Sequence, residues 1–162
     1  MTSIVEKELV HAPLASADRL LQAFFAAHPA PEGAGAHIVL RAGEATQPAI
    51  VRLERVHRPE DMTPRYAIHW EAESGGPYPD FDGELNVEAD EDYNAFWFVL
   101  NGSYEPPGGV AGQLFDAAIG HRIARATARG LLSQMRVETE ALFATQETTK
   151  RDAVRNIPIS KG

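Results

Sequence analysis

The side chains that could carry acid–base or metal chemistry are scattered along this chain without a recognisable spacing. No two histidines lie four residues apart on a predicted helix, and no histidine belongs to a metal-ligand pattern. His121, at the flank of a predicted long helix, is the one histidine that could reach the rim of a pocket. Strand alternation places His69 opposite Trp70, at the surface. We therefore expect no catalytic set, no metal and no cofactor. The six histidines are His11, His28, His37, His57, His69 and His121.

Two groups of carboxylates need separate treatment. Asp80, Asp82 and Glu84 alternate near the start of a predicted strand, but the glycine and the later glutamate of a calcium loop are missing. A solvated strand edge is the better interpretation. Asp116 lies near the first turns of the long helix, where a carboxylate interacts favourably with the helix N-terminus. The alternative for Asp116 is a buried acid with a raised pKa.

Composition limits the possible partners. The chain has 162 residues, enough for one domain with a sizeable core. A formal charge of -8 makes nucleic acid an improbable partner, because the surface repels phosphates. The chain has no cysteine, and we find neither a signal peptide nor a membrane-spanning run. We expect a cytoplasmic protein with no integral membrane association.

The secondary-structure elements that must position any site can be predicted from the spacing of apolar residues and from the prolines and glycines that interrupt strands and helices. Alternating apolar residues predict a first strand, and a helix capped by Ser16 or Asp18 follows it. Five further strands with short connections predict an antiparallel meander, because parallel pairing would need crossover helices. The predicted strands span residues 4–11, 37–41, 49–57, 65–72, 83–88 and 95–104.

A long proline-free segment, residues 109–143, predicts one helix near the C-terminus. One narrow sector of this helix is charged and should face water, whereas the opposite sector is apolar with small and polar interruptions. Residues 1–146 should form one domain, and residues 147–162 a polar tail that is flexible or serves as an arm on a partner subunit. The charged sector consists of Arg122, Arg125, Arg129, Arg136 and Glu140.

The order of these elements resembles the START-like superfamily, also called SRPBCC. The resemblance lies in a strand ending at Trp70, a loop with Pro79 and Phe81, a strand from Gly83, and the segment from Gly102 to Pro107. It covers about residues 4–144. These helix-grip proteins include birch pollen allergen-like carriers and polyketide cyclase/dehydratase-like proteins. The resemblance implies an α+β fold in which a curved antiparallel sheet of about six strands wraps around the C-terminal helix and keeps a cavity beneath it.

If the cavity is present, its lining can be predicted from the inward faces of strands and helix. We expect a small hydrophobic or amphipathic ligand, such as a lipid, to be bound there without covalent chemistry. Plain core packing would explain the same aromatics. The alternatives are a polyketide cyclase/dehydratase-like enzyme, or an interaction module that uses the outer face near Trp97; a homodimer is also left open. The expected ligand-binding residues are Ile68, Trp70, Phe96, Phe98, Leu100, Tyr104, Ile123, Thr127, Leu131 and Gln134.

Overall fold

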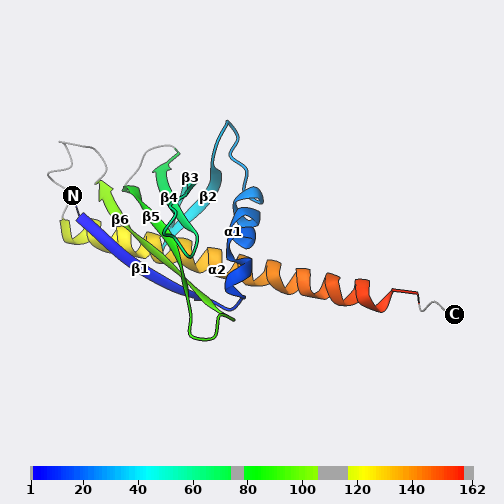
Figure 1. Cartoon of the computed structure of the whole chain (residues 1–162). Helices are drawn as coiled ribbons and strands as arrows, with labels where there is room; N and C mark the ends of the chain where they lie inside the picture. Colours follow the sequence, from blue (N-terminus) through cyan, green and yellow to red (C-terminus); the bar gives the residue numbers. More distant parts are fainter. Residues whose placement is uncertain (1, 74–78, 106–116, 159–162) are drawn as a thin grey trace.

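A curled antiparallel sheet and a long helix dominate the computed structural model, which describes residues 2–73, 79–105 and 117–158 (Figure 1). The sheet has the strand order β1-β6-β5-β4-β3-β2, so the first strand joins the open edge of a five-stranded meander. The predicted α+β helix-grip architecture is confirmed. The strands are β1 (Thr2–Val10), β2 (Ala36–Ala42), β3 (Ala45–Val56), β4 (Arg65–Ala72), β5 (Asp80–Ala89) and β6 (Phe96–Glu105).

Four strands begin earlier than predicted, β1 and β2 by one or two residues and β3 and β5 by three or four. The structure starts β3 at Ala45 although Pro48 lacks an N–H for the ladder. Pro48 faces Glu73, one residue beyond the end of β4, and its carbonyl accepts the Glu73 N–H at 3.0 Å. The N–H that Pro48 lacks therefore removes no hydrogen bond from the β3–β4 ladder, which starts at Ala49. β5 starts at Asp80, which brings Phe81 into the sheet.

A short helical segment closes one end of the sheet. The 3-10 turn η1 (Leu14–Ser16) leads from β1 into α1 (Ala17–Ala26). Leu20, Leu21 and Phe24 recur at helical spacing and are fully buried against the sheet core. This end therefore holds a conventional hydrophobic core.

The long helix α2 (Ala117–Arg155) runs along the sheet and continues past it (Figure 1). Its predicted start at residue 109 lies outside the described residues. Its predicted end at residue 143 is wrong, because the helix continues to Arg155. Apolar periodicity fades after Phe143, yet an established helix needs only the absence of a breaker to continue. The division at residue 146 falls inside α2, and the flexibility of the tail stays a prediction.

Three arginines of the charged sector of α2 contact β1 while their side chains stay partly exposed to water. Arg125 and Arg129 donate to the two carboxylate oxygens of Glu6 at 2.7 and 2.9 Å. Arg136 donates to Glu8 at 2.6 Å. The expectation that these arginines face only solvent is wrong, because the edge strand β1 places Glu6 and Glu8 on the face that α2 covers. Within the described ranges, no helix combines the length and apolar content needed to cross a membrane.

Candidate ligand-binding site

An aromatic row crosses the concave face of the sheet at the end opposite α1. Trp70 on β4 is the register partner of Phe81 on β5, which is the register partner of Tyr104 on β6. The Trp70 and Phe81 rings are stacked, with centroids 4.1 Å apart and planes 13° apart. His121 of α2 completes the row, with its ring centroid 6.2 Å from that of Tyr104. The row therefore joins three strands to the helix.

Two glycines support the Phe81 ring from below. Gly83 and Gly102 are register partners on adjacent strands, and a Cβ on either would overlap the backbone of the other strand and the tip of the Phe81 ring. Only residues without a side chain allow Phe81 to lie flat over the two strands. This arrangement leaves the ring face of Phe81 available to Trp70.

The row contains two buried polar atoms that have no hydrogen-bond partner among the residues that the structure describes. They are the indole Nε1 of Trp70, a residue only 2% exposed, and the Nδ1 of His121. An indole N–H can only donate, and an unsatisfied buried donor costs about 1–3 kcal/mol. Native interiors rarely leave such groups unmet, so each needs an explanation. A guest that supplies an acceptor oxygen would satisfy Trp70, and the atoms that now cover Nε1 would have to move to admit it.

The structure brings together only part of the predicted ligand-binding set. Trp70 and Tyr104 lie in the row, and Ile68 lies two residues before Trp70 on β4, opposite Gly83. Thr127 is buried on α2, but its hydroxyl already donates to the Ile123 carbonyl at 2.7 Å. Ile123 itself is half-buried.

The other predicted residues lie elsewhere. Phe96 and Phe98 sit near the η1 end of β6, with ring centroids 5.2 Å apart, inside the hydrophobic core. Leu100 and Leu131 are also fully buried, and they belong to the same core cluster as Trp70, Phe81 and Tyr104. Gln134 lies in an outer hollow between α2 and β2 and donates to Glu138 at 3.3 Å. A ligand-binding role for the ten residues stays a prediction.

Phe81 is missing from the predicted set, although a signal for it existed. The sequence places Leu85 and Val87 on the concave face, and alternation extends that face back to Phe81. A strand start taken at Gly83 excluded it. Asp116, the other candidate on the helix, lies outside the described residues.

The outer-face groups have ordinary partners. The Nδ1 of His69 lies 2.7 Å from a carboxylate oxygen of Asp82, and Glu84 lies 3.5 Å from Arg65. Trp97 donates its indole N–H to Asp90 at 3.3 Å, within its own hairpin. No cluster of three or more metal-ligating side chains occurs in the described part of the chain.

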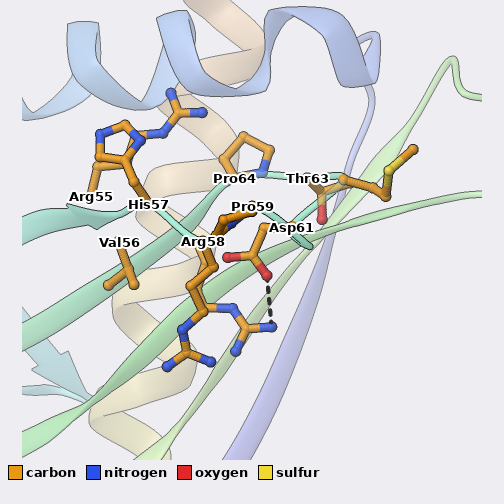
Figure 2. A pocket seen from close by; sticks show the side chains of 10 residues that line it. Arg55, Val56, His57, Arg58, Pro59, Asp61, Thr63 and Pro64 are labelled. Carbon is orange, nitrogen blue, oxygen red and sulfur yellow. Dashed lines mark ion pairs between the residues drawn. The ribbon is translucent and has the colours of Figure 1, made fainter.

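Hollows of 350 to 630 Å³ open on the outside of the molecule. Figure 2 shows one of 390 Å³ at the β3–β4 hairpin, where Asp61 lies among arginine side chains. Those arginines are engaged by carboxylates: Arg55 by Asp18 at 2.8 Å, and Arg65 by Asp61 at 3.4 Å. Among the described residues, one oxygen of Asp61 is buried in this hollow without a hydrogen-bond partner, whereas the aromatic row holds two such atoms.

The fold and the row define an α+β half-barrel closed by a helix. Neither a family model nor a curated protein sequence matches this chain. A solved structure of TTHA0849 from Thermus thermophilus is 16% identical, with a TM-score of 0.50, and covers 87% of this chain and 99% of that one. DynU16, from the dynemicin biosynthetic locus, is 19% identical with a TM-score of 0.38 over 79% of this chain and 48% of that one. At this identity, the first likeness shows the fold alone.

Proposed function

We propose that this protein binds a small, mainly apolar molecule that carries one hydrogen-bond acceptor. The guest lies between the concave face of the sheet and α2, beside Trp70, Phe81, Tyr104 and His121. The buried and unpartnered Nε1 of Trp70 is the observation that carries the proposal. The aromatic rings supply apolar contact, and the indole N–H selects an acceptor oxygen. Resemblance to START-like carriers supports the same function.

A matched pair of probes tests this proposal. 2-Acetylnaphthalene and 2-isopropenylnaphthalene have nearly the same shape and the same number of heavy atoms, but only the first carries an acceptor oxygen. Calorimetric titration should show the ketone binding about three- to tenfold more tightly, which corresponds to one neutral hydrogen bond of about 0.5–1.5 kcal/mol. Trp70→Phe should remove that preference while the hydrocarbon still binds.

Phe98→Leu is the matched control, because it alters a buried aromatic on the same concave face but outside the row. It should keep the preference for the ketone. Binding of neither probe, or an equal preference in wild type and Trp70→Phe, would count against the site.

A second candidate function has one supporting observation. Among the described residues, His121 Nδ1 is buried without a partner next to Tyr104, which supports a role for the imidazole and the phenol in proton exchange with a bound guest. This would suit a polyketide cyclase/dehydratase-like enzyme. His121→Gln should then abolish turnover of a polyketone while probe affinity changes less than about tenfold. Binding without turnover in the wild type favours the carrier.

A further inference from the structure

The last turns of α2 project beyond the rest of the molecule (Figure 1). Every residue from Thr148 to Arg155 is exposed, so no described part of the same chain covers this segment. Arg151 and Arg155 make no ion pair with any residue that the structure describes. An exposed helical extension with free guanidinium groups is a surface available to a partner.

The outward face of α2 leads from this extension to an apolar hollow. Val137, Ala141, Ala144 and Thr148 are exposed and follow one another at spacings of three and four residues, in line with Arg151 and Arg155. At Val137, which is 54% exposed, the face meets a 450 Å³ hollow between α2 and β2. Val39 of β2, 38% exposed, forms the opposite wall.

Charge is segregated along this part of α2. Residues 137–147 contain three acids and no basic residue. Glu140 and Glu147 flank the face, where Glu140 accepts the His11 backbone N–H at 3.0 Å and Glu147 lies 3.2 Å from Lys150, whereas Glu138 lies off the face, 2.6 Å from His28. Residues 148–155 contain Lys150, Arg151 and Arg155, with one acid. A segment whose two halves carry opposite charge is complementary to itself in antiparallel orientation, which is the requirement of a twofold interface.

We propose that two copies of this chain form a homodimer by antiparallel pairing of α2 over residues 140–155. The overlap is about 24 Å at a rise of 1.5 Å per residue. With Arg155 opposite Glu140, Arg151 of the same copy lies between Glu140 and Glu147 of the second copy. Ile157, which is 64% exposed, then reaches the level of Val137 and the hollow beside it. A second copy is favoured over an unrelated protein because the charge pattern complements itself.

Charge exchange between two full-length variants tests the proposal by sedimentation velocity. The first variant carries Arg151→Glu and Arg155→Glu, and the second carries Glu140→Arg and Glu147→Arg. Each alone should be monomeric at concentrations where the wild type is dimeric, with the dimer dissociation constant raised at least about tenfold. An equimolar mixture of the two should recover the dimer.

The control for the first variant is Arg58→Glu with Arg122→Glu, which makes the same change in net charge on exposed arginines away from this face and should remain dimeric. Circular dichroism checks that α2 stays helical. Val137→Asp provides an independent test at the hollow, with Val5→Asp on the exposed outer face of β1 as its control. A monomeric wild type, a dimer that survives both charge reversals, or a mixture that stays monomeric overturns the proposal.

Discussion

Glu6 on β1 and Arg125 on α2 are joined by a 2.7 Å hydrogen bond between elements 119 residues apart in the sequence. The second oxygen of the same carboxylate accepts from Arg129 at 2.9 Å. One nearly buried carboxylate thus holds two successive turns of the helix against the edge of the sheet. Burial alone would raise the pKa of Glu6, but the hydrogen bonds and charges of Arg125 and Arg129 outweigh it, so the pKa is lowered from its ordinary value of 4.5.

Replacement of Glu6 by Gln should destabilise the protein by about 1–3 kcal/mol at pH 7, the range for hydrogen bonds to charged groups. Because the folded-state pKa is lower than the unfolded one, the carboxylate contributes stability above about pH 4.5 and loses it as the pH falls through the folded pKa. Urea unfolding at pH 7, 5 and 3.5 should therefore show a shrinking difference between wild type and Glu6→Gln. A difference that does not depend on pH would contradict this role.

Glu88→Gln is the control for that experiment. Glu88 lies on the outer face, 52% exposed and 4.0 Å from Lys7. Exposed ion pairs of this kind contribute about 0–1 kcal/mol, so this variant should change the free energy of unfolding very little.

Ionisation of Tyr66 should make the free energy of unfolding depend on pH in the alkaline range. Its phenol is buried, and the hydroxyl donates to Asp18, which also pairs with Arg55. Burial, the hydrogen bond and the negative charge of Asp18 raise the pKa of Tyr66 well above 10.0. The contribution to stability is full below pH 10 and declines as the pH rises towards the folded pKa.

The test is Tyr66→Phe. The free energy of unfolding of this variant should be about 1–3 kcal/mol lower than that of the wild type at pH 7, because Asp18 loses a hydrogen-bond donor. The difference should become smaller above pH 10. Chemical unfolding at pH 7, 9 and 10.5 measures both effects. Tyr93→Phe, at an exposed tyrosine, should show neither. A loss that stays constant up to pH 10.5 would show that Tyr66 ionises as an ordinary phenol.

The faces of the strands could be predicted from the sequence, whereas the contacts of helix α2 could not. Alternation places Ile68, Trp70 and Phe98 on the concave face, because a strand must turn successive side chains to opposite faces. The contacts of Arg125 could not be predicted in the same way, since they depend on which edge of the sheet the helix approaches. The unpartnered Trp70 Nε1 likewise depends on atomic positions across three strands and a helix, which no spacing in the sequence encodes.

Gly130 should be intolerant of a side chain, although alanine is the better helix former. A Cβ at this position would overlap the carbonyl oxygen of Arg41 on β2. The α2 backbone would have to move away from the sheet edge, and overpacking of this kind costs about 1–3 kcal/mol. Gly130→Ala should therefore destabilise the protein in chemical unfolding. Thr148→Ala, at an exposed helical position, should instead stabilise it by a few tenths of a kcal/mol.

The last prediction concerns the stability of the unliganded aromatic row. Trp70→Phe removes ring volume, which costs stability, but it also removes a buried donor without a partner, which restores about 1–3 kcal/mol. The two effects oppose each other, so the free energy of unfolding should change by less than about 1 kcal/mol. Leu85→Ala, at a fully buried position with no polar atom, should lose about 2–5 kcal/mol. If Trp70→Phe instead costs more than about 3 kcal/mol, the indole N–H is already satisfied in the free protein. The interior would then have no unmet donor for the acceptor of a ligand, and the proposed binding site would lose its main support.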